Sequence, residues 1–358
     1  MRLAVLAPPP AARDATWRPL LEAFAGRGND VLVLEPGQSD QRQSEQSAPE
    51  GCERVAYRDL FELKSFAPAV ADADAVLVAS NLDHGAVVGR WARRTATGAK
   101  VFYDVDAPAT LAEIEGGKRA RDEGAGDYDL YLSDTGGPIL GRLERGVQAR
   151  AARTLYRSVD TETFQPCQRP LKWDLGYIGA YDADREAVIE RLLIEPARRA
   201  PRRTFVIAGS GYGDSERWPA NIERLGEVPE ASRPAFYAAC RFILNTARPD
   251  RAEAGFSPGA GLFEAAACGA AMIAEPWPGL SSLFAPGREI QTARTPDEVV
   301  RLLFWSSELE RRRMADAARR KVVAHHSAER RAEQLEDLLH DACEGRARSA
   351  WAGLRAAI

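Results

Sequence analysis

Short apolar runs alternate with amphipathic segments along most of the chain. Two such runs flank a helical pattern that places Trp17, Leu20 and Phe24 on one face. Apolar runs predict buried strands at 3–6, 31–34, 76–79, 101–103 and 130–133, with another helix around 86–94. Strands that alternate with helices are typical of a parallel sheet, so an α/β fold is expected here. The segment 38–52, which is rich in Gln, Ser and Glu, is expected to be a surface loop.

A second alternating series follows a stretch with little periodicity between Asp160 and Lys172. It predicts strands at 175–178, 204–208, 242–245, 271–274 and 289–291. The tail over 307–343 is rich in Arg, Glu, Ala and Leu, which predicts helix with a break near 325–327. We therefore expect α/β domains over 1–165 and 170–335. A helical segment over 336–358, with Trp351 and Leu354, would pack back on the first domain.

Length and charge narrow the class of protein. A chain of 358 residues exceeds the usual size of a single core, which agrees with two domains. The net charge of -4 argues against a surface built mainly to hold nucleic acid or anionic membrane. Five cysteines without CxxC spacing predict reduced thiols. With no apolar run of membrane-spanning length, we expect a cytoplasmic protein without an integral membrane segment.

The glycine-rich segment 255–278 is the most informative part of the chain. Ser257 is a suitable N-cap, and a proline follows it at the first helical position, so a helix is expected to begin there. Gly259, Ala260 and Gly261 leave its first turn without bulky side chains. Free N–H groups and the positive end of the helix dipole would then be open to an anion such as a diphosphate.

The same helix is apolar nearly all round and carries one acid, Glu264. A buried carboxylate is costly unless it is paired or hydrogen-bonded, and a ribose diol offers two donors to one carboxylate. Glu264 could equally complement the helix dipole or cap a neighbouring loop. The residues alone leave both interpretations open.

Glycines and arginines recur in the turns of the second series. A glycine lets a ligand approach the backbone closely, and an arginine can neutralise phosphate. These turns follow strands at their carboxyl ends, where open α/β sheets bind ligands. Ordinary turns and solvated arginines are the structural alternatives. The candidates for donor binding are Gly176, Gly179, Arg185, Gly209, Arg248 and Arg251.

Two candidates for acid–base chemistry lie in the first series. His84 and Asp106 each follow a predicted strand, where either could orient an acceptor hydroxyl or take its proton. A cap or turn residue is the alternative for each. His325 and His326 cannot share one helix face and have no acidic or Cys partner at ligand spacing, so no metal site is predicted. The patterns GxSxG, HExxH and Walker A do not occur, which excludes the common hydrolases and P-loop enzymes.

Motifs between about residues 100 and 300 resemble, in order, those of the GT-B nucleotide-sugar glycosyltransferases, in particular the branch related to the spore maturation protein CgeB. They read VFYDVDAPATLA, DLYLSDTGGPILGRLE, SVDTETFQP, WDLGYIGAYDADRE, FVIAGSGYG, ERLGEVP and LFEAAACGAAMIAE. The resemblance implies a bacterial-type enzyme with two Rossmann-like domains that face a cleft. The first would bind acceptor and the second donor nucleotide, with a C-terminal helix crossing back between them.

The resemblance also assigns roles to residues. Glu264 takes the place of the family's donor-ribose acid, and Gly176 and Gly179 that of the loop near the donor phosphates. The segment 257–261 takes the place of the phosphate-facing helix start. Two positions depart from the family pattern: Phe256 stands where many retaining members carry a second acid, and Gly261 where CgeB-like sequences often carry arginine. Donor choice and retention of configuration therefore stay open, with Arg185, Arg248 or Arg251 as possible substitutes for the missing charge.

The expected activity is metal-independent transfer of a sugar from a nucleotide-diphosphate donor to a hydroxyl acceptor, without a cofactor. The acceptor could be a glycan, a small molecule, a protein or, with less support from the charge, a nucleic acid. A sugar-nucleotide epimerase and a non-catalytic nucleotide-sugar-binding protein on the same fold are the alternatives.

Overall fold

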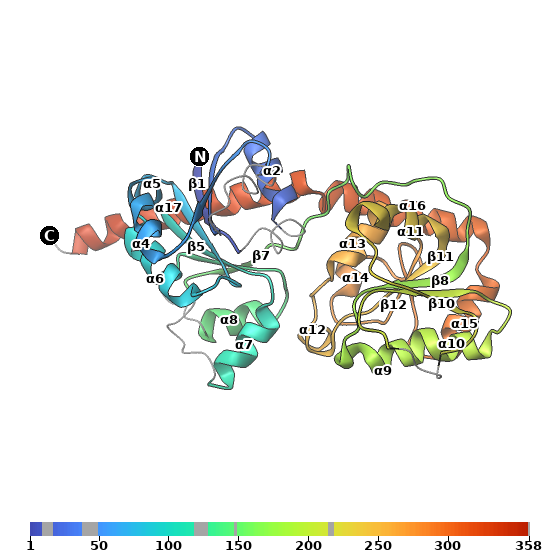
Figure 1. The fold of residues 1–358 in the computed structure, drawn as a ribbon. Helices are drawn as coiled ribbons and strands as arrows, with labels where there is room; N and C mark the ends of the chain where they lie inside the picture. The colour runs from blue at the N-terminus through green and yellow to red at the C-terminus, as the bar shows by residue number, and fades with distance from the viewer. Residues whose placement is uncertain (9–16, 38–48, 118–127, 147–148, 214–217, 357–358) are drawn as a thin grey trace. The chain divides into compact units, whose positions relative to one another are not determined.

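A computed structural model describes residues 1–8, 17–37, 49–117, 128–146, 149–213 and 218–356, with side chains up to 346 (Figure 1). Most of the predicted loop at 38–52, and the side chains of Trp351 and Leu354, lie outside this part. The chain divides into two compact units. Unit 1 comprises Met1–Ser158 and Ala328–Ile358, and unit 2 comprises Val159–Ser327.

Unit 1 is built on a seven-stranded sheet in the order β3-β2-β1-β4-β5-β6-β7, with every pair parallel. Helices α2 and α17 pack on each other, and α7 packs on α8. The strands are β1 Arg2–Leu6, β2 Asp30–Pro36, β3 Cys52–Tyr57, β4 Ala75–Ala79, β5 Ala99–Asp104, β6 Leu130–Ser133 and β7 Ala152–Thr154. The helices are α2 Arg18–Gly26, α4 Leu60–Leu63, η2 Lys64–Phe66, α5 Ala67–Ala71, α6 Gly85–Thr95, α7 Ala107–Glu115, α8 Ile139–Gly146 and α17 Ala328–Ala356.

Unit 2 is built on a six-stranded parallel sheet in the order β10-β9-β8-β11-β12-β13. Helices α11, α13 and α16 lie on one face, and α9, α10 and α15 on the other (Figure 1). The strands are β8 Trp173–Ile178, β9 Phe205–Ala208, β10 Ile222–Leu225, β11 Cys240–Asn245, β12 Met272–Ala274 and β13 Gln291–Thr292. The helices are η3 Ala183–Arg185, α9 Glu186–Ile189, η4 Glu190–Ile194, α10 Glu195–Arg199, η5 Glu230–Ser232, α11 Arg233–Ala239, α12 Pro249–Ala254, α13 Ala260–Ala267, α14 Leu280–Leu283, α15 Pro296–Trp305 and α16 Glu308–His325.

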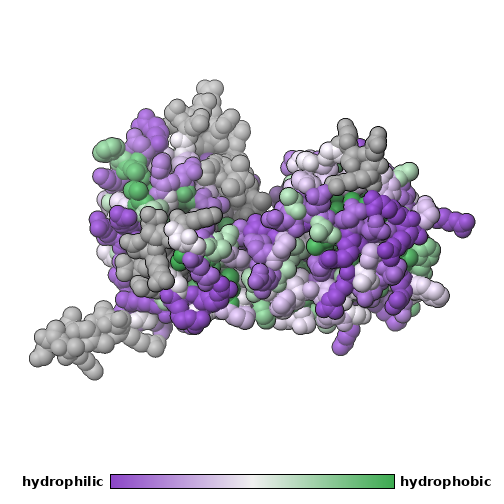
Figure 2. All heavy atoms as spheres, turned by 90° about the horizontal axis from the view of Figure 1, so that it is seen from below, coloured by the Kyte–Doolittle hydropathy of each residue, from purple (hydrophilic) through white to green (hydrophobic). Residues whose placement is uncertain are grey.

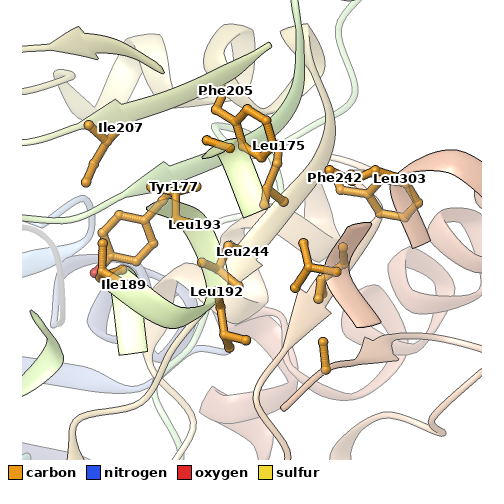
Figure 3. Packing of buried hydrophobic residues seen from close by; sticks show 14 of the residues in the cluster. Leu175, Tyr177, Ile189, Leu192, Leu193, Phe205, Ile207, Phe242, Leu244 and Leu303 are labelled. Carbon is orange, nitrogen blue, oxygen red and sulfur yellow. The ribbon is translucent and has the colours of Figure 1, made fainter. Parts of the chain in front are cut away.

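The core of unit 2 forms where strands and helices interleave apolar side chains. Strand residues such as Leu175, Phe205 and Phe242 meet Leu192 and Leu303 from the covering helices (Figure 3). All five side chains are fully buried. Burying a large apolar side chain contributes roughly 1.5–3 kcal/mol, so this packing fixes the positions of the loops that leave the strands.

The predicted α/β fold is confirmed, and the predicted central strands are present. Strands β3, β7 and β10 were not predicted because they lie at or near the sheet edges and carry polar residues. For example, β10 reads IERL and has one buried residue. An edge strand that faces water gives no continuous apolar run.

The predicted break in the tail is confirmed between α16 and α17. Unit 2 ends at Ser327, and the residues from Ala328 onward belong to unit 1. The predicted second domain runs to 335. The boundary between the units therefore lies at the helix break and not inside α17. Hydrophilic residues cover much of the face seen in Figure 2, with apolar residues scattered among them. In the described ranges, no helix is both long and apolar enough to cross a bilayer.

Candidate functional site

The topology of unit 2 places its switch point between β8 and β11. From β8 the chain moves outward to β9 and β10 on one side, and then returns to β11 on the other. In open α/β sheets, ligands bind at the carboxyl ends of the strands beside such a point. The loops after β8, β9 and β11 and the start of α13 all leave this carboxyl edge.

Helix α13 begins at Ala260, with Gly259 in an extended conformation at the N-cap. The predicted start at Ser257 and Pro258 is therefore wrong by two residues. Ser257 is 1% exposed, and its hydroxyl accepts a hydrogen bond from Arg251 Nη1 at 3.0 Å. Ser257 thus belongs to the loop before the helix, where it joins that loop to α12.

The first turn of α13 is sterically open. A Cβ atom added at Gly259 would have no atom within 4 Å, and one added at Gly261 would meet Tyr237 Oη at 3.9 Å. Because the N-cap is a glycine, it has no side chain to occupy the N–H groups of this turn. The helix ends at Ala267, and Gly269 shortly after it has a φ of 69°, which favours glycine.

Glu264 is held by two residues of α11. Arg233 Nη1 donates to Oε1 at 3.1 Å and to Oε2 at 3.3 Å, and Tyr237 Oη donates to Oε2 at 2.9 Å. The Glu264 side chain is 12% exposed. Burial raises the pKa of its carboxyl, and the charge of Arg233 opposes that rise. The lone acid of the apolar helix is thus a paired carboxylate.

Arg233 was not predicted as a site residue. It occupies the first position of α11, and its sequence context, a charged residue before a proline, is ordinary for a helix start. Only the fold brings α11 beside α13. A carboxylate offers about four acceptor positions, and three are occupied here, two of them on Oε2. Glu264 can therefore accept one further donor on Oε1.

The glycines of the neighbouring loops serve different purposes. Gly176 lies inside β8, where an added Cβ would come within 2.4 Å of Cys240 Sγ. Gly176 thus lies within a strand rather than in the loop, where it makes room for a side chain, and its role in donor binding stays a prediction. Gly179 and Gly209 do lie at the carboxyl edge, where a Cβ on Gly209 would lie 2.0 Å from the Gly179 carbonyl oxygen. The loops after β8 and β9 thus pack backbone against backbone.

The three predicted arginines are engaged within their own loops. Arg185 Nε donates to Asp182 at 3.0 Å, and its Nη1 donates to the Tyr177 hydroxyl at 3.3 Å. Arg248 makes two hydrogen bonds to the carboxylate of Asp250, at 3.1 and 2.7 Å. Arg251 holds Ser257. All three lie near the carboxyl edge, but each first serves to order a loop.

Phe256 adopts a left-handed conformation, with a φ of 48°. A bulky residue is strained there, and such strain often marks functional loops. Its N–H donates to the Pro278 carbonyl at 2.6 Å, and a Cβ on Gly279 would lie 2.5 Å from its ring. Where the resemblance would place a second acid, the chain thus has an aromatic ring packed on the loop after β12.

In unit 1, the two predicted catalytic residues follow adjacent strands. His84 is exposed, has a φ of 55°, and precedes α6 after β4. Asp106 precedes α7 after β5, and neither side chain caps its helix. The Asp106 N–H donates to Asp104 Oδ1 at 2.9 Å. Both residues therefore lie at the carboxyl edge of the sheet of unit 1, as predicted for acid–base candidates.

Buried carboxylates beside Asp106 were not predicted. Asp104 is fully buried at the end of β5 and accepts a hydrogen bond from the Tyr131 hydroxyl. Asp134, which is 1% exposed, follows β6 and lies 3.4 Å from Arg157 Nε. The signal in the sequence was an Asp at the end of an apolar run in VFYD and LYLSD. These groups rigidify the edge from which Asp106 projects.

Residues 185–337 match the family model described as "Glycosyl transferase-like". The match begins at Arg185 and includes α11, α13 and the Arg233–Glu264 pair. Residues 185–337 thus resemble a glycosyltransferase domain, and this match spans less than half of the chain. The prediction of a transferase enzyme is confirmed at this level. No curated protein sequence matches the chain.

Solved glycosyltransferase structures share the fold. HepE from Anabaena, in complex with UDP and glucose, has a TM-score of 0.69 at 15% identity, over 95% of this chain and 100% of that one. Sucrose-phosphate synthase from Thermosynechococcus elongatus has a TM-score of 0.64 at 14% identity, with coverages of 95% and 98%. An alpha-glucosyltransferase bound to UDP and a 13-mer DNA has a TM-score of 0.64 at 11% identity, with coverages of 95% and 99%. At such identities the likeness establishes the fold alone.

Proposed function

We propose that this GT-B glycosyltransferase binds a nucleotide-diphosphate sugar at the carboxyl edge of unit 2 and transfers the sugar to a hydroxyl acceptor without a metal ion. The observation that carries the proposal is Glu264, a paired and largely buried carboxylate about one turn from an open helix start. Its remaining acceptor position suits a ribose hydroxyl. Complexes of HepE with UDP and UDP-glucose support a uridine nucleotide as the first donor to test.

In this proposal, the open first turn of α13 stabilises the charge that develops on the leaving diphosphate. Free N–H groups and the helix dipole attract an anion there, and stabilisation of developing charge usually contributes more to catalysis than any other single effect. Among the described residues, no group of three His, Cys, Asp or Glu side chains has a metal-binding arrangement. Positive charge at the site would come from backbone and arginine.

Unit 1 would supply the acceptor side. Asp106 and His84 are the candidate bases for the acceptor hydroxyl, since each follows a strand at the carboxyl edge of the sheet. The proposal also includes that the protein belongs to the CgeB-like branch and that it is located in the cytoplasm. The acceptor class stays open among glycans, small molecules, proteins and nucleic acid.

The proposal is tested in two steps. A thermal-shift panel of nucleotide diphosphates and nucleotide sugars should give a clear rise in melting temperature for one base, because a ligand of the folded state stabilises by mass action. The donor so identified is then incubated with and without a panel of acceptors, and release of the nucleoside diphosphate is measured. Release that depends on an acceptor supports transfer. Conversion of donor alone would indicate an epimerase, and binding without turnover a binding protein.

A further inference from the structure

Arg233, which lies beside the candidate ribose acid Glu264, uses only some of its N–H donors. Arg233 uses Nη1 for both of its hydrogen bonds to Glu264. Within the described part of the chain, Nε and Nη2 of Arg233 make no hydrogen bond, and its side chain is 29% exposed. A guanidinium carries five N–H donors in a rigid fork, so this group can hold a carboxylate on one side and an anion on the other.

The first turn of α13 lies near Tyr237, which also holds Glu264. Gly261 contributes no side chain, and the position its Cβ would take lies 3.9 Å from Tyr237 Oη. That hydroxyl is in turn 2.9 Å from Glu264 Oε2. The bare first turn of α13, Tyr237, Glu264 and Arg233 therefore border one region. Arg233 Nη1 lies 3.1 Å from Glu264 Oε1, so a ligand that hydrogen-bonds to Glu264 would lie next to the Arg233 guanidinium.

The other arginines at this edge are less well placed for that task. Arg185 and Arg248 are paired with acids of their own loops, Asp182 and Asp250, and not with the candidate ribose acid. Arg233, by contrast, touches the Glu264 carboxylate directly. A group that already contacts the ribose acid can also reach the phosphates that follow the ribose in a nucleotide.

We propose that Arg233 is a donor-binding residue, which contacts a phosphate of the nucleotide diphosphate through Nε and Nη2 while Nη1 holds Glu264. In this way α11 supplies the positive charge that Gly261 does not. This inference rests on the proposed function, since it takes the donor site of unit 2 as given. The alternative is that Arg233 only positions Glu264.

The test separates a phosphate contact from a positioning role. UDP and uridine share the ribose and differ in the diphosphate, so their dissociation constants are measured by calorimetry for the wild type and for Arg233→Gln. We expect Arg233→Gln to weaken UDP binding by about tenfold or more, as for loss of a hydrogen bond between charged groups, while uridine binding changes by less than about threefold. Arg233→Lys, which keeps the charge and loses the fork, should fall in between.

Two further variants serve as controls. Tyr237→Phe removes a hydrogen bond to Glu264 without touching the free side of Arg233, so it should weaken UDP and uridine by the same factor. Arg199→Gln removes a charge at the end of α10, where Arg199 pairs with Asp297, and should change neither constant. Circular dichroism checks that each variant is folded.

Equal losses of UDP and uridine affinity in Arg233→Gln, or no loss at all, would overturn the inference while leaving the nucleotide site intact. If the wild type binds neither UDP nor any other nucleoside diphosphate in the same experiment, the proposed function itself fails. The two failures are therefore distinguishable.

Discussion

At the scale of single residues, burial of the Glu264 carboxylate is energetically unfavourable, but the same carboxylate is the proposed acceptor for the ribose. Burial disfavours its ionised form and raises its pKa, and Arg233 and Tyr237 offset part of that cost. The folded pKa lies above that of the unfolded chain. The stability contributed by this group is thus present below its ordinary value of 4.5 and is lost as pH rises through the folded pKa. The unliganded protein tolerates the ionised acid because its partners remain.

A pH dependence of binding follows from the same shift. Only the ionised carboxylate accepts from a ribose hydroxyl on Oε1 while it stays paired with Arg233. We expect the ratio of UDP affinities between wild type and Glu264→Gln to grow as pH rises through the raised pKa of Glu264, and then to level off. The affinities of both proteins are measured by calorimetry at each pH. Because the phosphates of UDP titrate in the same way for both proteins, their titration does not affect the ratio. If the ratio of UDP affinities stayed constant at every pH, UDP binding would not depend on the ionisation of Glu264.

At the scale of elements, the site depends on how closely strands and loops approach each other. Gly176 pairs with Val206 and Ile243 inside the sheet, and its missing Cβ admits Cys240 Sγ. Gly209 and Gly179 let two loops touch through their backbones at the carboxyl edge. The contact at Gly176 determines how the strands pack within the sheet. The contact between Gly209 and Gly179 determines the shape of the candidate site. Glycines in similar sequence contexts thus have different roles, one in packing within the sheet and the others in the approach of two loops.

A double-mutant cycle tests the structural role of Gly176. Gly176→Ala should destabilise the protein by about 1–3 kcal/mol, as expected for overpacking of a tight interior. Cys240→Ala removes the sulfur that the new methyl group would meet, so the double variant should recover part of that loss. Denaturant unfolding measures each free energy. Gly226→Ala, where an added Cβ meets no atom within 4 Å, is the matched control.

Strictly additive losses in that cycle would contradict the packing explanation. If Gly176→Ala left stability unchanged and reduced nucleotide binding, the assignment of Gly176 to the sheet rather than to a phosphate loop would be wrong.

At the scale of the whole molecule, apolar periodicity was sufficient to predict two α/β units, because buried parallel strands give continuous apolar runs. It also indicated the last helix break and the acid of α13. It could not predict edge strand β10, whose polar residues carry no such signal. Nor could it predict Arg233, since the contact with Glu264 joins residues that are distant in sequence and meet only after α11 and α13 pack on the sheet.

The proposed donor binding by unit 2 therefore depends on one carboxylate, Glu264, and its surroundings. Nucleotide binding is expected to use Glu264 as a ribose acceptor, the open start of α13 for the diphosphate, and Arg233 between them. In the proposed function, unit 1 would contribute His84 and Asp106 on the acceptor side. In this proposal, transfer would need both units, whereas donor binding tests the second unit alone.

The most direct measurement is the calorimetric affinity of wild type and Glu264→Gln for the nucleoside diphosphate selected by the thermal-shift panel, near neutral pH. Replacing the carboxylate by an amide of the same shape removes a charged acceptor, so we expect the affinity to fall by about tenfold or more with folding unchanged. An unchanged affinity in a folded Glu264→Gln variant would contradict the ribose role and, with it, the placement of the donor site.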